Sequence, residues 1–197
     1  RRAWQLNYGN GIPGLKAQLR VEDFQTIDPD LADIDRPYAR LPQLLVNYTK
    51  GDVQGLEFEF NNDTAYFKKN IRDFENQAEP NGTRIFNEMA LRYNLKQPWG
   101  FVVPEVSVRS LNNFYDQDTV ENANFRSNSE DKSVVVPQFT LDTGLTFERE
   151  GKYLQTLSPR AFYAYAPHQN QDDYPNFDST AASLNYDQLF NPKRFYG

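Results

Sequence analysis

The chain reads Leu15-Lys16-Ala17-Gln18-Leu19-Arg20-Val21-Glu22 near its beginning, with apolar and polar side chains in strict alternation. Successive side chains of a β-strand point to opposite faces of a sheet, so this stretch predicts a ribbon with one apolar and one polar face. We predict a strand over about 15–26 from this stretch, and similar stretches lie at 2–8, 43–49, 56–61, 84–95, 101–111, 135–148 and 153–165. We therefore predict an all-β chain of about eight antiparallel strands in four hairpins.

The connections between these strands come in two lengths. Short turns lie at 9–14, 50–55, 96–100 and 150–152, and long polar loops at 27–42, 68–82, 112–132 and 166–197. Hairpins with all short turns at one end and all long loops at the other are typical of transmembrane β-barrels. The strands also have roughly the 9–11 residues that a tilted strand needs to cross a bilayer. We expect these strands to form part of a barrel wall.

The composition excludes several other classes of protein. No apolar run approaches the ~18 residues of a membrane-spanning helix. The net charge of −6 argues against nucleic acid as a partner, because that partner needs clustered Lys and Arg. The chain has no cysteine, hence no disulfide or thiolate metal site. His168 is the single histidine and lies in a polar loop, where it is expected to be solvated. We expect no enzyme activity, no cofactor and no metal.

Two other interpretations stay open at this stage. A soluble antiparallel sandwich also alternates apolar and polar residues, and it would bind carbohydrate on a platform of Trp4, Trp99 and Tyr115. A general porin or receptor barrel is the other. The sorting of the connections favours a barrel over a sandwich. So does the polar face, which carries side chains of both charges at neighbouring levels, as a wet lumen with cross-strand pairs would.

Several strands begin with a proline followed by a polar residue, at Pro42, Pro104, Pro137 and Pro159. Proline cannot donate to a sheet ladder, so we expect bends or weakened hydrogen bonding at these sites. The proline-led stretches 41–48, 136–139 and 154–167, together with 169–179 and 189–197, resemble the LptD family of LPS-assembly proteins. The resemblance covers most of the chain in order and is strongest from about residue 133 onward.

The resemblance implies a large outer-membrane β-barrel in a Gram-negative bacterium, preceded by a periplasmic jelly-roll domain. A lipoprotein, LptE, plugs such a barrel, and lipopolysaccharide reaches it through periplasmic bridge proteins and leaves between the first and last strands. Residues 1–197 would be one partial domain, an internal section of the barrel wall surrounded by outer-membrane lipid. On this resemblance it would lack the jelly roll, the seam strands and the cysteines that the family uses for disulfides. The short turns would then be periplasmic and the long loops extracellular.

On that basis the chain is part of the translocon that inserts lipopolysaccharide into the outer leaflet. Its candidate binding residues are the ionic side chains of the polar face, which we expect to line the hydrated lumen near the plug or the sugar-rich part of the substrate. These residues are Glu57, Glu59, Arg84, Glu88, Arg92, Glu105, Arg109, Asp142 and Arg160. The alternative is that they only pair with one another. Since no leader and no terminal strand are visible, we expect the chain to be an internal piece of a longer protein.

Overall fold

The computed structural model describes residues 2–9, 11–25, 27, 30, 36–69, 81–116, 131–169, 177, 180–181, 185, 187–191 and 195–196. Its elements are β1 (Arg2–Tyr8), β2 (Leu15–Asp23), β3 (Ala39–Val53), β4 (Leu56–Lys68), β5 (Gly82–Tyr93), β6 (Leu95–Gln97), β7 (Gly100–Tyr115), β8 (Lys132–Leu145), β9 (Phe147–Arg149), β10 (Gln155–Leu157), β11 (Arg160–Tyr165), β12 (Thr180–Ala181), the 3-10 helix η3 (Asp187–Phe190) and β13 (Phe195–Tyr196). Among these residues no helix is long and apolar enough to span a membrane.

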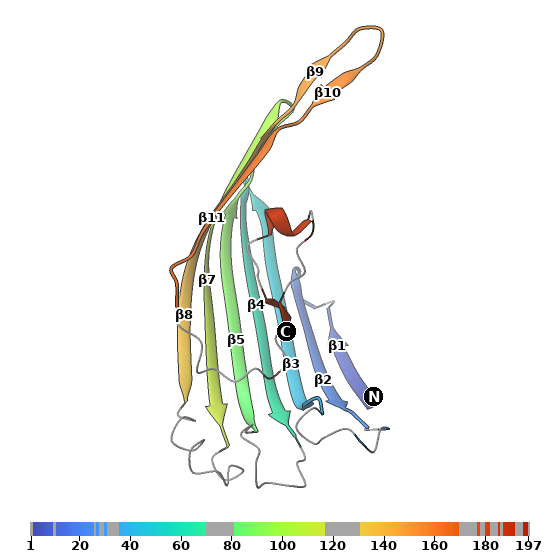
Figure 1. The fold of residues 1–197 in the computed structure, drawn as a ribbon, viewed down its shortest axis with the longest axis vertical. Helices are drawn as coiled ribbons and strands as arrows, with labels where there is room; N and C mark the ends of the chain where they lie inside the picture. The colour runs from blue at the N-terminus through green and yellow to red at the C-terminus, as the bar shows by residue number, and fades with distance from the viewer. Residues whose placement is uncertain are drawn as a thin grey trace.

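The main sheet is an antiparallel meander. Its strands follow the order β1-β2-β3-β4-β5-β7-β8-β11, and β6 pairs with β7 as a short continuation of β5 (Figure 1). Each strand on this path therefore lies beside its neighbours in the sequence. The predicted all-β antiparallel fold with about eight meandering strands is confirmed. Over the described ranges the path runs from β1 to β11 and does not close on itself.

The short turns gather at one end of the sheet, the upper end in Figure 1, and the ends of β2, β4 and β7 that lead into three of the long connections lie at the other. The β3–β4 turn shows how tight they are. Gln54 and Gly55, its two central residues, have φ values of 57° and 88°. Positive φ at both positions defines the type I′ turn, whose twist matches that of the flanking strands. Glycine suits the second position because it has no Cβ to clash in this conformation.

Several predicted boundaries are wrong. β3 runs from Ala39 to Val53 and not over 43–49, so it takes residues from both the predicted 27–42 loop and the predicted 50–55 turn. β7 and β8 likewise extend into the predicted 112–132 loop, and β2 ends at Asp23. Backbone pairing extends these strands beyond the alternating sequence, because ladder hydrogen bonds do not require apolar side chains. The middles of two long loops, 70–80 and 117–130, lie outside the described residues.

The last two predicted strands are each divided in two. β9 and β10 pair with each other as a separate ribbon that projects beyond the main sheet (Figure 1). Ser158 and Pro159 separate β10 from β11, which then pairs with β8 from Arg160 to Tyr165. Pro159 contributes to this interruption because it has no N–H for a ladder hydrogen bond.

The other strand prolines differ from one another: Pro104 and Pro137 lie within the unbroken β7–β8 pairing, opposite Leu141 and Val108. Pro42 lies within the register shift between Arg40 and Gln43. Pro104 lies beside the gap at Asn94, where β5 ends before β6 begins. Pro137 comes two residues before Phe139, which pairs with Tyr165 at the end of β11. Pro42 and Pro159 agree with the prediction of locally weakened hydrogen bonding, since sheet prolines are tolerated where a ladder is already broken, and for Pro104 and Pro137 it stays a prediction.

The two faces of the sheet have the opposite polarity from those of a soluble protein. One face, here called the outer face, exposes a belt of large apolar side chains from every strand on the path, among them Trp4, Leu6, Leu19, Leu44, Phe58, Met89, Leu91, Val106, Val108, Phe139 and Tyr163. The other, the inner face, buries polar and charged side chains, among them Glu22, Gln43, Arg84, Glu88, Ser107, Gln138 and Thr140. Exposed contiguous apolar surface of this kind marks contact with lipid or protein.

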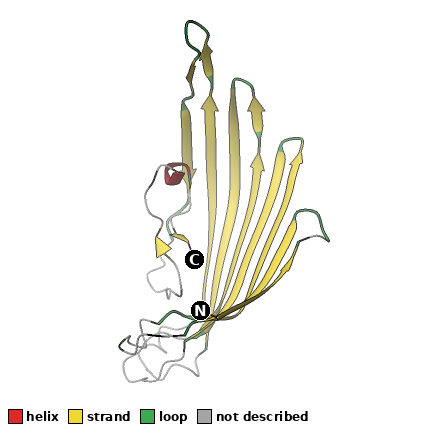
Figure 2. Cartoon of the chain, turned by 90° about the vertical axis from the view of Figure 1, so that its right-hand side faces the viewer, coloured by secondary structure: helices red, strands yellow, loops and turns green. Residues whose placement is uncertain are grey.

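The fourth long connection differs from the prediction, which placed 166–197 with the other loops. Its described parts contact the inner face: the Phe177 ring stacks on Phe67, and the Phe190 ring packs on Phe162. Figure 2 shows η3 and the β12–β13 pair beside the main sheet and not within it. We call the described residues between Phe177 and Tyr196 the inner strap. No local pattern signals this placement, because it depends on aromatic contacts with distant strands.

Candidate functional site

Arg92 lies at the centre of a charged network on the inner face. Its Nη1 atom is 2.5 Å from Glu57 Oε1, and its Nη2 atom is 2.6 Å from Glu105 Oε2. Glu59 Oε2 lies 3.9 Å from the same Nη2 atom. The register explains the arrangement, since Arg92 on β5 is directly opposite Glu57 on β4 and Glu105 on β7. Opposite charges on facing residues of neighbouring strands stabilise a sheet.

The remaining predicted site residues form pairs on the same face. Arg109 donates from Nε to Glu88 Oε1 over 2.7 Å. Arg160 holds Asp142 with two hydrogen bonds of 2.9 and 2.6 Å, the bidentate geometry that guanidinium groups favour with carboxylates. Arg84 lies 3.7 Å from Asp63. The structure therefore brings all the predicted residues to one face, where each contacts a residue of opposite charge.

The network includes residues that the sequence-based choice of site omitted. Asn47 donates to Asn61, whose own amide nitrogen reaches Glu59, and Gln43 donates to Asp63 over 2.8 Å. At the β2 end, Glu22 is nearly fully buried and lies 3.3 Å from Arg40. Gln43, Asn47, Asn61 and Glu22 lie at period-two positions on the inner face, so the alternation itself could have found them, whereas Arg40 reaches this face through the register shift before Gln43.

A cavity of about 260 Å³ opens on the inner face beneath the inner strap. Residues of β4, β5, β7 and β8 form its floor and walls: Glu59, Glu88, Ala90, Arg92, Val103, Glu105, Arg109, Thr140 and Asp142. Phe162 of β11 and Phe190 and Asn191 of the inner strap cover it. The Arg160 guanidinium lies 4.2 Å from the Phe190 ring centroid, a cation–π contact that helps to hold η3 in place.

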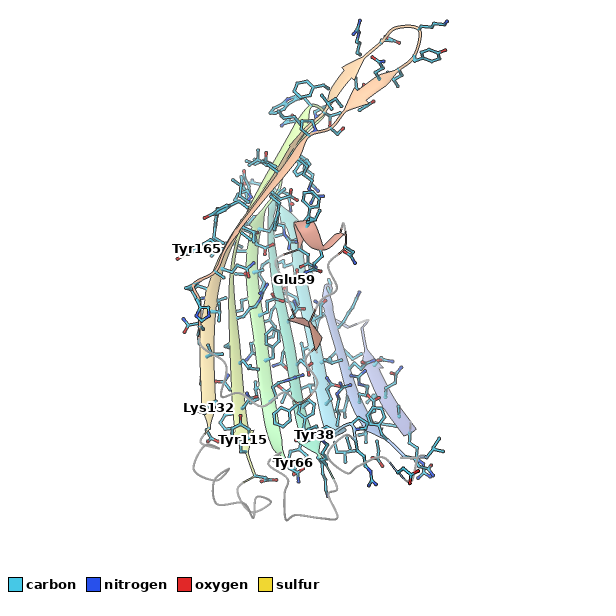
Figure 3. All side chains as sticks on the ribbon, in the orientation of Figure 1. Tyr38, Glu59, Tyr66, Tyr115, Lys132 and Tyr165 are labelled. Atoms are coloured by element: carbon cyan, nitrogen blue, oxygen red, sulfur yellow. The ribbon has the colours of Figure 1, made fainter. Side chains whose placement is uncertain are left out.

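An aromatic cluster occupies the inner face nearer the long-loop end, where Figure 3 labels Tyr38 and Tyr115. Phe67 and Phe177 stack with ring centroids 4.7 Å apart and planes 8° from parallel. Tyr38 meets Phe177 edge-on with ring centroids 5.2 Å apart, and the Tyr115 ring centroid lies 6.5 Å from that of Phe177. The inner face therefore has a charged zone beside Glu59 and an aromatic zone that fixes the inner strap at Phe177 (Figure 3).

The described residues contain no group of three His, Cys, Asp or Glu side chains arranged to hold a metal ion. His168 is exposed. The charged zone is thus a surface of paired arginine and carboxylate side chains.

Replacing Arg92 with methionine is expected to lower the free energy of unfolding by about 1–3 kcal/mol, because Glu57, Glu59 and Glu105 lose a charged hydrogen-bonding partner. Urea titration of the protein folded in lipid vesicles measures the change. Arg92→Lys keeps the positive charge but not the planar guanidinium group, so it should lower the free energy of unfolding less than Arg92→Met does. Adding Glu105→Gln to Arg92→Met should recover part of the loss. Equal stability of Arg92→Met and the parent would show that the network contributes nothing to the fold.

Comparison of the sequence with known proteins shows which family the chain matches. The model for LptD, described as "LPS transport system D", matches residues 2–197. The LPS-assembly protein LptD of Acinetobacter baumannii is 68% identical over 197 residues, covering 100% of this chain and 24% of that relative. The same-named proteins of Acinetobacter baylyi and Neisseria meningitidis (serogroup B) are 66% and 33% identical, again over 100% of this chain and 24% of each relative. The chain thus spans less than a quarter of the length of these curated relatives.

Proposed function

Because the chain belongs to the LptD family, we propose that it forms part of the wall of an outer-membrane β-barrel that carries lipopolysaccharide to the outer leaflet. In this proposal residues 1–197 are an internal section of a larger barrel. The outer face meets membrane lipid and the inner face lines a hydrated lumen. The short turns are periplasmic and the long loops at the opposite end are extracellular.

The observation that carries this proposal is the reversed polarity of the sheet. Leu91 is 47% exposed on the outer face, whereas Glu88, three residues earlier on the same strand, is 6% exposed on the inner face. In water this arrangement is unfavourable, since each exposed leucine forgoes roughly 1.5–3 kcal/mol of burial. In a bilayer it is favourable, because the outer face contacts hydrocarbon and the ionic residues stay in a wet interior.

A soluble sandwich fits the structure poorly. A second sheet would have to cover the apolar face, but the inner strap covers the polar one. The proposed sugar platform also fails: Tyr115 is buried in the aromatic cluster, whereas Trp4 is exposed on the opposite, outer face. These two residues therefore cannot present rings to one ligand. The wall of a barrel is the function that the geometry supports best.

We assign the lumen-facing charges a passive role. They keep the interior hydrated for the sugars of lipopolysaccharide, while the energy for transport comes from elsewhere. We propose that they also contact a plug lipoprotein such as LptE, or saccharide; the family match and their position on the inner face support this. A periplasmic bridge would deliver the substrate through parts of the protein outside this chain.

Depletion of the full-length protein tests the proposal. The expected result is a fall in lipopolysaccharide at the cell surface and its accumulation inside the outer membrane. A general porin or receptor barrel would leave surface lipopolysaccharide unchanged and lower the uptake of a small solute instead. Folding of the full-length protein to a soluble monomer without detergent or lipid would remove the barrel-wall assignment altogether.

A further inference from the structure

The outer face carries a group of uncharged polar side chains between its apolar belt and the long-loop end of the sheet. They come from four adjacent strands, β4, β5, β7 and β8. We call them the polar band: Asn62, Thr64, Asn87, Ser110, Asn112 and Ser133. Polar groups on a surface that otherwise meets hydrocarbon need an explanation, because the bilayer core offers them no hydrogen-bond partners.

The register of the strands places the polar band on the outer face. Asn87 is two residues from Met89, and Ser110 is two residues from Val108; both of these apolar side chains are exposed in the belt. Asn62 lies directly opposite Asn87, which in turn lies directly opposite Ser110. No register shift interrupts the β4–β5 or β5–β7 pairing over these residues, so residues two apart on a strand stay on one face.

Hydrogen bonds connect the members of the polar band across the strands. Asn62 donates from Nδ2 to Asn87 Oδ1 over 2.8 Å, and Asn87 donates to Ser110 Oγ over 3.4 Å. Between β8 and β7, Ser133 donates to Asn112 Oδ1 over 2.7 Å. Each asparagine side chain has two donor hydrogens and two acceptor lone pairs, so these bonds use only part of its capacity. The polar band is therefore able to form further hydrogen bonds with an outside ligand.

The height of the apolar belt places the polar band at the edge of the hydrocarbon. On β8 the outer-face positions from Val135 to Leu145 are apolar apart from Thr143, whose hydroxyl donates to the Phe101 carbonyl over 3.1 Å. At about 3.3 Å per residue this stretch is roughly 33 Å long. A strand tilted by ~40° crosses about 25 Å of bilayer over that length, which is the usual height of the apolar band in outer-membrane barrels. Ser133, the next outer-face position, then lies at the headgroup level.

The chemistry of the polar band suits a sugar headgroup and not phosphate. Amide and hydroxyl groups both donate and accept hydrogen bonds, as the hydroxyl groups of a saccharide do. The band itself contains no charged side chain, whereas strong recognition of phosphate uses arginine or lysine. In the proposed function the long loops are extracellular, so the lipid beside the band is the lipopolysaccharide of the outer leaflet. In that orientation the apolar belt meets the hydrocarbon chains of the same lipid.

We propose that the polar band binds sugar hydroxyl groups in the headgroup of lipopolysaccharide molecules that surround the barrel in the outer leaflet. This inference rests on the proposed function and adds a second contact with the same glycolipid, on the lipid-facing side of the wall and not in the lumen. The contact fixes the level of the wall in the membrane, because the apolar belt and the polar band each meet the matching layer of the lipid.

Two outer-face valines of nearly equal exposure allow a matched crosslinking test. Val135 lies directly opposite Ser110 of the polar band and is 53% exposed, whereas Val106 lies in the apolar belt and is 57% exposed. A photo-crosslinking amino acid at each position is irradiated in the full-length protein, folded in vesicles of equal masses of phospholipid and lipopolysaccharide. The crosslinked ratio of lipopolysaccharide to phospholipid is expected to be at least about fivefold higher at position 135 than at position 106, the effect of about one net hydrogen bond.

A variant of the polar band separates binding from folding. Asn112→Leu with Ser133→Ala removes both members of one hydrogen-bonded pair, so neither residue leaves the other without its partner. The urea midpoint in vesicles should stay equal to that of the parent or rise, because replacing both partners by apolar groups costs little. The crosslinked ratio at position 135 should fall to the ratio at position 106.

Three results would contradict these expectations in different ways. An equal ratio at positions 135 and 106 of the parent, with lipid crosslinked at both, overturns the headgroup contact and leaves the lipid-facing wall standing. A higher ratio at position 135 that persists unchanged in the variant, or that disappears when the phosphates of the lipopolysaccharide are removed, overturns recognition by the amides and hydroxyls of the polar band. Absence of any lipid crosslink at both positions overturns the proposed function as well.

Discussion

Replacing Phe67 with alanine is expected to lower the free energy of unfolding by about 3–5 kcal/mol. Phe67 is 0% exposed and lies at the centre of the aromatic cluster, stacked on Phe177 and edge-on to Tyr38. The Arg84 guanidinium also lies 4.8 Å from the Phe67 ring centroid. The substitution therefore removes a large buried ring and leaves a cavity between the sheet and the inner strap. Urea titration of the full-length protein in lipid vesicles measures the loss.

Two further variants identify the source of that effect. Phe67→Leu keeps much of the volume and should cost clearly less than Phe67→Ala. Phe177→Ala, combined with Phe67→Ala in a double-mutant cycle, should give a coupling energy of about 0.5–1.5 kcal/mol, because the two rings are in contact. If the cycle shows no coupling, the inner strap does not rest on Phe67 and the cover over the inner face is absent.

Replacing Leu91 with arginine is expected to destabilise the membrane-inserted protein by up to about 2–4 kcal/mol, because it places a cation on the lipid-facing surface. Leu91 is exposed within the apolar belt, between its cross-strand partners Phe58 and Val106. That cost lowers the ratio of folded to unfolded protein by about 30- to 700-fold. The measurement is the fraction of full-length protein that reaches the heat-modifiable, folded form in the outer membrane, together with the urea midpoint in vesicles.

Leu157 provides the matched control. It is also an exposed leucine in a strand, but β10 belongs to the ribbon beyond the main sheet. Leu157→Arg should therefore change stability by less than about 0.5 kcal/mol, as substitutions on a water-exposed surface usually do. Equal tolerance of both arginines would falsify the assignment of the outer face to lipid. An equal loss of stability in both variants would show that the apolar belt includes the ribbon.

Much of the sheet could be predicted because its determinants are local. The alternation of 15–22 or 56–61 specifies which side chains share a face, and neighbouring hairpins then place consecutive strands side by side. The boundaries were less predictable: Ala39–Pro42 has no alternating pattern, yet it joins β3 because β4 is long enough to pair with it. Where a strand ends depends on how far the neighbouring strand extends, and the sequence of a single segment does not contain that information.

The charged zone was predictable only in part. That Arg92 and Glu105 share the inner face follows from period-two spacing on two strands. That they contact each other depends on register, which a one-residue slip would change. Phe177 and Phe190 were not chosen as site residues, because nothing in 166–197 indicates which surface these rings meet.

The meander also sets an order of assembly. Every strand on the path pairs with a strand close to it in sequence, so each hairpin closes a modest loop at little entropic cost. The contact of Phe177 with Tyr38 spans most of the chain and becomes favourable only once Phe67 and Tyr115 have been brought together. We therefore expect the hairpins of the sheet to form one after another and the inner strap to pack on the inner face last. Until it docks, a folding factor or a lumenal partner arriving from the open side meets an uncovered inner face.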